Sequence, residues 1–392
     1  MNELKNGATR SAEADLNIKL VCSEIYGLDV SVHPLSGEQD LNFMVRDVSG
    51  EAYVLKISEP ASDPDLLKLQ NKVLHFLEAG RVGPLSGLHV PRIIPSRRGR
   101  KIENLQVRGT VHPVRLLTYL PGRPIARVRP HSSELLKELG GILGSIDLRL
   151  SQVSLADSAR RNFMWDLRRG AEVIRENLSW IRETGKREII TRILETCLPI
   201  LEERQHALRT GLIHNDANDY NIIVSSRAPG TLRVSGLIDF GDLVDSWIAA
   251  EPAIAATYLM MGKHDPVSAA ADLIAGYDSC NPLTDEELAV VFPLACLRAG
   301  VSVCLSARRG QECPENKYLT ISEEPAWKLL EQLVAIHPRL AEYRIRDACR
   351  REPCPRSSSL VSWLRSRAGS FHSPLPVNLE DSAQAVIGLG GD

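Results

Sequence analysis

The sequence lacks the features that would assign it to a nucleic-acid-binding, metal-cluster or membrane protein. Its 47 lysine and arginine residues nearly balance its 49 aspartate and glutamate residues, so there is no net basic field for nucleic acid or an anionic lipid surface. Its eight cysteines include no C-x-x-C pair and are expected to be free thiols. The longest apolar stretch, residues 248–261, is broken by a glutamate and a proline and is shorter than the ~20 residues of a membrane span. We therefore expect a soluble protein of a reducing cytoplasm, with no nucleic-acid or membrane partner.

Apolar residues make up 43% of the chain, which is enough for a buried core in two or three compact units. The front third alternates apolar and polar residues with the period of strands. Strands are expected at residues 30–35, 42–48, 52–57, 90–94 and 114–119, with a helix at 65–77. After the Pro121-Gly122 turn the apolar spacing becomes helical. Helices are expected at 133–150, 162–180, 186–210, 266–277, 285–308 and 323–336, with short strands at 222–224 and 234–238.

A sheet-rich beginning and a helical remainder predict an α+β fold of two lobes, with an antiparallel-sheet N-lobe and a mainly helical C-lobe. Near residue 338 the composition changes again, to arginines and prolines, with one short helix expected at 357–367. The expected divisions are an N-terminal arm at 1–17, the N-lobe at 18–120, the C-lobe at 121–337 and a C-terminal tail or linker at 338–392.

Two short motifs in the C-lobe carry residues suited to one kind of chemistry. Residues 214–216 read His-Asn-Asp and are followed by Asn221, and residues 239–241 read Asp-Phe-Gly after an apolar strand. Turn-forming residues are common in loops, but the two halves in this order, each beside a strand, favour phosphoryl transfer. Asp216 would accept the proton of a substrate hydroxyl, while Asn221 and Asp239 would offer oxygen ligands to Mg²⁺. The histidine is interpreted as a buried residue that holds the loop.

A kinase also needs groups in the N-lobe that bind the nucleotide phosphates. Lys56 lies between apolar residues on the third predicted strand, where a phosphate-binding lysine is expected. Ser36 and Gly37 form the first hairpin turn and would cradle the phosphates, although a single glycine makes this a weak signal. Gln70 stands where an acidic partner for the lysine is expected. A glutamine cannot pair that charge, so another carboxylate would have to serve.

Taken together, these segments resemble the aminoglycoside phosphotransferase and choline kinase superfamily, and within it the hydroxylysine kinase branch. The matching phrases are YVLKIS at 53–58, VRLLTYLPGRPIA at 114–126, RNFMWDL at 161–167, HNDANDYNIIV at 214–224, VSGLIDFGD at 234–242 and PENKYL at 314–319. The resemblance runs from about residue 18 to residue 335. It implies a protein-kinase-like fold of two lobes, with the N-lobe binding nucleotide and the C-lobe carrying the catalytic and metal residues.

The resemblance also implies a role for individual positions. Asp216 is expected as catalytic base, Asn221 and Asp239 as Mg²⁺ ligands, and Lys56 on the phosphates of ATP or GTP. The purine is expected to contact the backbone of Thr118, Tyr119 and Leu120. The branch is associated with GTP as donor, and bacterial relatives can carry a pyridoxal-phosphate (PLP) dependent enzyme domain after the kinase, so the tail could lead into such a domain.

The acceptor is expected to be the hydroxyl of a hydroxylated amino acid or amino alcohol, such as hydroxylysine. An ammonium would need carboxylates near the catalytic base, and a carboxylate would need a cation. The candidates are Asp219, Asp242, Asp245, Glu251 and Arg298. Choline, ethanolamine, homoserine or an aminoglycoside as acceptor, and a non-catalytic nucleotide-binding domain, remain alternatives. A protein kinase is disfavoured because no A-P-E phrase follows the D-F-G motif.

Overall fold

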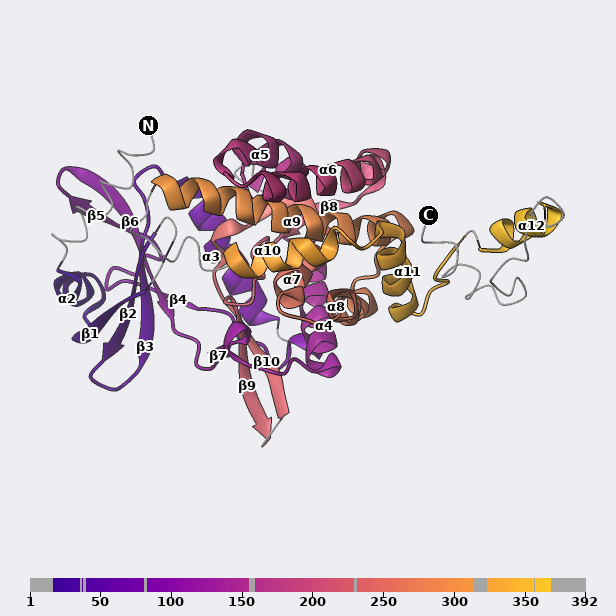
Figure 1. The fold of residues 1–392 in the computed structure, drawn as a ribbon. Coiled ribbons are helices and arrows are strands. Elements are labelled where there is room, and N and C mark those ends of the chain that lie inside the picture. The colour runs from indigo at the N-terminus through magenta and orange to yellow at the C-terminus, as the bar shows by residue number, and fades with distance from the viewer. Residues whose placement is uncertain are drawn as a thin grey trace.

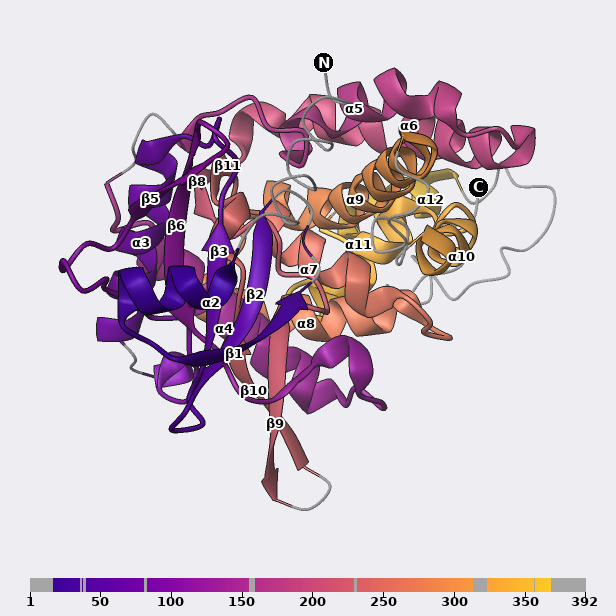
Figure 2. The ribbon, with the colours of Figure 1, turned by 90° about the vertical axis from the view of Figure 1, so that its left-hand side faces the viewer.

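The computed structural model describes residues 17–35, 37, 40–80, 83–154, 159–228, 231–312, 323–355 and 357–367. A twisted sheet forms one end of the molecule, and a larger group of helices forms the rest (Figures 1 and 2). The predicted α+β fold of two lobes is therefore confirmed. The proposed phosphate-loop residue Ser36, the arm at 1–16 and the PENKYL phrase lie outside the described residues.

The N-lobe is an antiparallel sheet with the strand order β1-β2-β3-β6-β4, and β5 pairs with β6. Its strands are β1 (Val30–Leu35), β2 (Leu41–Asp47), β3 (Ala52–Ile57), β4 (Ile93–Ile94), β5 (Glu103–Val107) and β6 (Thr110–Thr118). Helix α2 (Ile18–Val21) continues into a single wider turn at Cys22–Tyr26, and α3 (Pro64–Ala79) begins after the cap residue Asp63.

The alternation in β3 decides what each face of this sheet does. Tyr53, Leu55 and Ile57 are buried in a small core with α2, as expected for one apolar face of a strand. Lys56 therefore points to the opposite face. Register places it between Asn42 on β2 and Arg115 on β6.

The C-lobe is built from helices around one large core. Its helices are α4 (Ser133–Leu150), α5 (Gly170–Asn177), α6 (Thr184–Arg204), α7 (Ala250–Met260), α8 (Pro266–Cys280), α9 (Asp285–Glu312), α10 (Glu323–Leu333) and α11 (Pro338–Ala348). Beyond them, α12 (Ser357–Arg367) stands apart from the lobe in Figure 1. Short single turns lie at 83–85, 125–127, 167–169, 178–180, 205–207 and 240–242.

Two small sheets interrupt the helices and carry the loops between them. Strands β9 (Ile222–Ala228) and β10 (Thr231–Leu237) form a hairpin, and β7 (Arg123–Pro124) pairs with its base. Strands β8 (Thr210–Ile213) and β11 (Val244–Trp247) pair with each other. The two sequence motifs therefore follow β8 and β10, where strand ends hold their backbones.

Helices α4 and α8 cross at very close range because glycines occupy the crossing. A Cβ atom at Gly140 would lie 1.9 Å from the Leu273 carbonyl oxygen, and one at Gly276 would lie 2.0 Å from the Lys137 carbonyl oxygen. No side chain fits at those distances. The glycines thus let the two helix backbones pack directly against each other.

Helix α9 is the central element of the C-lobe core. It is long and apolar enough in composition to cross a membrane, but its whole apolar window is buried inside the protein. It contacts α5, α6, α7, α10 and α11. Its apolar character is explained by its position in the core of the lobe.

The structure corrects three expectations from the sequence. Residues 162–180 form a loop, two single turns and the short α5 instead of one helix. Strands β5, β7, β8 and β11 were not expected. The C-lobe also extends past residue 337, because α11 packs on α8 and α9 and buries Ala341 and Ile345 in the core. The helix expected at 357–367 is present as α12.

Candidate active site

The loop between β8 and β9 holds the predicted catalytic base against the predicted metal ligand. The Asn221 side-chain Nδ2 donates hydrogen bonds to Asp216 Oδ2 at 2.7 Å and to its carbonyl oxygen at 2.9 Å. Asn218 Nδ2 donates to Asp216 Oδ1 at 3.0 Å. These bonds fix the carboxylate orientation and leave the Asn221 amide oxygen to face other groups.

His214 ties this loop to the strand that leads into the second motif. Its Nε2 lies 3.1 Å from the Ile238 carbonyl oxygen, and its Nδ1 accepts the Asp216 backbone N–H at 3.2 Å. Its ring packs edge-on against Phe240, and burial lowers the pKa of the imidazole to about 4. The residue therefore holds the loop as a neutral imidazole, as the sequence indicates.

Glu251 was expected near the acceptor, and the structure corrects this expectation. The residue lies on α7 and is fully buried beneath the loop, where Oε2 accepts the Asn215 backbone N–H at 2.8 Å. Asn215 has φ of 66°, in the left-handed region that favours glycine or asparagine. Burial raises the pKa of Glu251 to about 7. Glu251 thus supports the strained turn beside Asp216 rather than facing a substrate.

The second motif places Asp239 opposite the N-lobe lysine. Asp239 follows β10 with φ of 63°, and its Oδ1 lies 2.8 Å from Lys56 Nζ. The lysine charge lowers the pKa of Asp239. Burial alone would lower the pKa of Lys56, but the carboxylates of Asp239 and Asp40 raise it overall. Residues 183 positions apart in sequence are thereby joined across the two lobes.

Asp40 is a site residue that sequence reasoning missed. It directly precedes β2. Two residues later in the chain, Asn42 is the register partner of Lys56. Burial raises the pKa of Asp40, while Lys56 and Arg115 act to lower it. Its place at the strand start was the available signal. Asp40 therefore acts on Lys56 as an additional carboxylate, a role that Gln70 cannot fill.

The oxygen groups at this junction suit a hard cation that also binds phosphates. Asp239 keeps 46% of its side chain exposed beside the lysine, and Asn221 contributes an amide oxygen. Among the described residues, no group of three or more histidine, cysteine, aspartate or glutamate side chains could hold a metal alone. Mg²⁺ is commonly bound by one or two carboxylates together with substrate phosphates, which fits this sparse set of ligands.

Gln70 takes a different role from an ion-pair partner. Its Nε2 donates to the Gly241 carbonyl oxygen at 3.1 Å. Arg161 Nη2, from the RNFMWDL segment of the C-lobe, donates to the same oxygen at 3.2 Å. One carbonyl of the D-F-G motif is thus held from both lobes, which explains why a neutral amide fits on α3.

The hinge is partly engaged within the protein. The Thr118 N–H donates to the Arg92 carbonyl oxygen at 2.9 Å, and the Tyr119 N–H donates to the Ala52 carbonyl oxygen at 3.0 Å. Those two amides are therefore not available to a purine. The Leu120 amide and the hinge carbonyl groups remain candidates. Gly37, between β1 and β2, is half-buried.

The predicted acceptor residues separate into different environments. Arg298 on α9 donates from Nη2 to Asp216 Oδ1 at 3.2 Å, so it lies directly at the catalytic loop. Asp242 lies close enough to Arg298 to affect its pKa. Asp219 follows in the same loop, and burial raises its pKa to about 6. Asp245 is buried and pairs with Arg160 at 3.1 Å, which removes it from the acceptor candidates.

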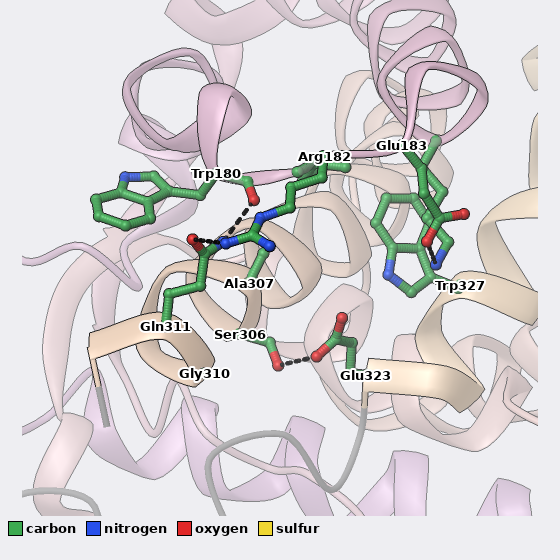
Figure 3. Close-up of a pocket in the computed structure, with 11 residues that line it drawn as sticks. Trp180, Arg182, Glu183, Ser306, Ala307, Gly310, Gln311, Glu323 and Trp327 are labelled. Carbon is green, nitrogen blue, oxygen red and sulfur yellow. Dashed lines mark hydrogen bonds and ion pairs between the residues drawn. The ribbon is translucent and has the colours of Figure 1, made fainter. Parts of the chain in front are cut away.

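A cavity of about 240 Å³ opens between the start of α6, the end of α9 and α10 (Figure 3). Its polar groups bond one another: Ser306 Oγ donates to Glu323 Oε2, and Gln311 Nε2 donates to the Trp180 carbonyl oxygen. Its lining includes none of the catalytic-loop or D-F-G residues. We assign it no part in the chemistry.

Comparison with known proteins identifies the family of this chain. A model of the phosphotransferase enzyme family matches residues 31–288, which is more than half of the chain. The chain belongs to the phosphotransferase enzyme family. It is therefore a kinase, and a nucleotide serves as its phosphoryl donor.

Curated relatives and solved structures extend the likeness over most of the sequence. Hydroxylysine kinase of Mus musculus is 31% identical over 341 residues, covering 81% of this chain and 88% of the relative. Hydroxylysine kinase of Xenopus laevis is 31% identical and covers 81% and 89%. The structure of amicoumacin kinase with AMP-PNP, Ca²⁺ and Ami aligns with a TM-score of 0.60 at 17% identity, covering 82% and 96%. A microcompartment-associated aminopropanol kinase gives 0.59 at 20% identity, covering 85% and 98%.

Proposed function

We propose that this phosphotransferase moves the γ-phosphate of ATP or GTP to the hydroxyl of a hydroxylated amino acid or amino alcohol, with hydroxylysine as the first candidate. The family membership establishes a small-molecule phosphotransferase. The choice of acceptor is supported by the curated relatives, whose names specify hydroxylysine. A carboxylate and a cation beside the catalytic loop suit an acceptor that carries both an amine and a carboxylate.

The observation that carries the proposal is the meeting of the two motifs with the N-lobe lysine. Asp216 is bonded to Asn221, the Asn221 carbonyl oxygen accepts the Ile238 N–H at 3.0 Å, and the next residue, Asp239, contacts Lys56. A hydroxyl acceptor and a triphosphate between these groups would have a base on one side and cations on the other. Phosphoryl transfer needs chiefly this positioning and charge neutralisation.

In the proposed mechanism, Asp216 orients the acceptor hydroxyl and takes its proton as the oxygen attacks the γ-phosphorus. The bond from that phosphorus to the oxygen that bridges to the β-phosphate breaks, and the nucleoside diphosphate leaves. The bonds from Asn218 and Asn221 keep the carboxylate aimed. Lys56 would bind the phosphates from the N-lobe, and Asn221 and Asp239 would hold Mg²⁺. When bound, that ion would neutralise charge on the phosphate oxygens.

The experiment is a screen of hydroxylated amines and amino acids against ATP and GTP with Mg²⁺, reading nucleoside diphosphate release and acceptor phosphorylation. We expect hydroxylysine to be phosphorylated. Asp216→Asn should lower kcat by ~10² to 10⁴-fold, because the base is lost while the amide keeps the shape. Failure of hydroxylysine, ethanolamine, choline, threonine and homoserine with both donors would overturn the proposed acceptor class.

A matched control is Asp245→Asn, which changes a buried aspartate that pairs with Arg160 outside the loop. Thermal unfolding of both variants checks that they fold. Equal loss of activity in the two variants would mean that the effect comes from folding and not from Asp216 acting as base.

A further inference from the structure

Arg298 is held rigidly beside the catalytic loop. Only 2% of the residue is exposed, and its guanidinium lies 4.3 Å from the centre of the Trp165 ring. Nε and Nη2 donate to the Tyr258 hydroxyl at 3.2 and 3.1 Å, and Nη2 also donates to Asp216 Oδ1. One edge of the guanidinium is therefore fully engaged, and its plane is set by the indole.

The other edge is not engaged. Arg298 Nη1 is buried and has no hydrogen-bond partner, although it carries two N–H donors. Leaving buried donors of a charged group unpaired costs stability, so such a group favours binding an acceptor from outside the protein. A rigid, buried guanidinium with one free edge is the arrangement that binds an oxyanion with high selectivity, because the protein has already met the cost of ordering it.

We propose that Arg298 Nη1 binds the carboxylate of the acceptor, so that the substrate is a hydroxy amino acid and not a simple amino alcohol. The inference rests on the proposed function and deepens it. Nη1 and Nη2 share one carbon, and Nη2 contacts Asp216. An acceptor whose hydroxyl meets Asp216 can therefore place its carboxylate against Nη1.

The surroundings favour the acceptor over the transferring phosphate as the source of the anion. Arg298, Trp165 and Tyr258 all belong to the C-lobe, whereas the triphosphate is expected between Lys56 and Asp239. Trp165 and Tyr258 are almost fully buried and fix the guanidinium from its face and from one edge.

The test uses pairs of acceptors that differ only in the carboxylate: 5-hydroxylysine against 1,5-diamino-2-pentanol, and threonine against 1-amino-2-propanol. For the wild-type protein we expect kcat/KM to favour the amino acid by ~10²-fold or more, since a site built for a polar group rejects an analogue that lacks it. In Arg298→Lys the KM of the amino acid should rise and the preference should shrink to less than ~10-fold. Both acceptors losing kcat equally, with the preference intact, would overturn the proposal.

Two further variants keep the test decisive if Arg298→Lys folds poorly. Tyr258→Phe removes the hydroxyl that orients the guanidinium and should reduce the preference about threefold to tenfold with less effect on folding. Arg308→Lys alters another arginine of α9, one that bonds Glu312 and Asn177, and should leave the preference unchanged. A preference unaffected by Tyr258→Phe and Arg298→Lys alike would refute the role of Arg298.

Calorimetric binding separates this inference from the proposed function. Hydroxylysine and its amide are titrated into the wild-type protein with a non-hydrolysable nucleotide and Mg²⁺. Tighter binding of the acid, lost in Arg298→Lys, would support the carboxylate site even if no phosphate were transferred. Equal binding of the acid and the amide would overturn it even if hydroxylysine were a good substrate.

Discussion

At the scale of single residues, His214 links the two halves of the site through both ring nitrogens. Nδ1 accepts a backbone N–H from Asp216, so Nε2 must carry the proton that it donates to the Ile238 carbonyl. A second proton would break the first of these bonds. The loop geometry therefore depends on the imidazole remaining neutral.

This dependence predicts a pH effect on stability. Burial lowers the pKa of His214 from its ordinary 6.5 to about 4, so below pH 6.5 the unfolded chain takes up a proton that the folded chain does not. The contribution of His214 is thus complete above pH 6.5 and is lost as the pH falls. The free energy of unfolding of the wild-type protein, relative to His214→Asn, should drop by about 2 kcal/mol between pH 7.5 and pH 5.

Urea unfolding of both proteins at the two pH values measures this difference. His75→Asn, at an exposed position of α3, is the control and should show no comparable change. A constant difference between wild type and His214→Asn over this range would mean that the folded protein accepts the proton at His214.

Residue spacing was enough to predict Asp216, Asn221, Asp239 and Lys56 as one group, because each stands at a fixed position within a short motif or strand. It was not enough for Glu251. Whether a helix-start carboxylate faces a substrate or supports a backbone amide depends on how α7 packs beneath the loop. That packing involves contacts that no local pattern records.

At the scale of elements, the crossing of α4 and α8 depends on the absence of side chains. Gly140 and Gly276 each bring their own helix backbone against a carbonyl group of the partner helix. Such contacts leave no room for the relaxation that larger side chains allow in other cores.

Gly276→Ala should therefore lower the free energy of unfolding by about 3 kcal/mol, since the new methyl group would meet the Lys137 carbonyl oxygen. The control is Gly185→Ala, in α6, where nothing lies within 4 Å of the added atom. Alanine there should stabilise the helix by up to ~1 kcal/mol. Denaturant unfolding of both variants provides the comparison. If Gly276→Ala left the free energy of unfolding unchanged, or changed it in the same way as Gly185→Ala, α4 and α8 would be able to separate at little cost.

Strongly patterned elements were predictable, and elements set by distant contacts were not. Strand β3 and helix α4 match their predicted ranges because their alternation and spacing are regular. The helix expected at 162–180 is interrupted at Asp166, whose buried carboxylate accepts the Arg168 N–H and the Ser246 hydroxyl. Ser246 lies on β11, so the sequence around Asp166 gave no sign of this bond.

The arginines after residue 337 misled the sequence analysis in a similar way. They suggested a tail or linker, but Arg346 pairs with Asp285 at 2.9 Å and Arg351 pairs with Asp278 at 2.6 Å. Their partners belong to α9 and α8. In sequence, a run of arginines that pairs with aspartates of another helix looks the same as a run that faces water.

At the scale of the whole molecule, the two lobes share apolar packing, because Leu69, Val73 and Leu77 of α3 belong to the same core as the C-lobe helices, and polar contacts around the D-F-G motif add to it. Lys56 pairs with Asp239, and Gln70 and Arg161 share the Gly241 carbonyl oxygen. These contacts lie where the nucleotide phosphates are expected. The relative position of the lobes and nucleotide binding are therefore expected to be coupled.

Lys56→Gln should raise the KM for nucleotide at least ~10-fold and increase backbone amide exchange around residues 237–242, because the cross-lobe ion pair is lost. Lys68→Gln breaks an ion pair to Asp65 in which both side chains are about 70% exposed, and such surface pairs contribute little. It should change neither quantity. Hydrogen exchange with mass spectrometry and steady-state kinetics test both variants. Unchanged exchange at 237–242 in Lys56→Gln would show that the Lys56–Asp239 ion pair does not order this segment.

Helix α9 has a consequence for how this protein could change over evolutionary time. The residue we assign to substrate choice, Arg298, stands in the middle of the helix on which five other helices pack. A mutation that alters its selectivity would at the same time disturb the scaffold that keeps the whole lobe folded. Substrate choice and the stability of the lobe are therefore expected to be constrained together in this protein.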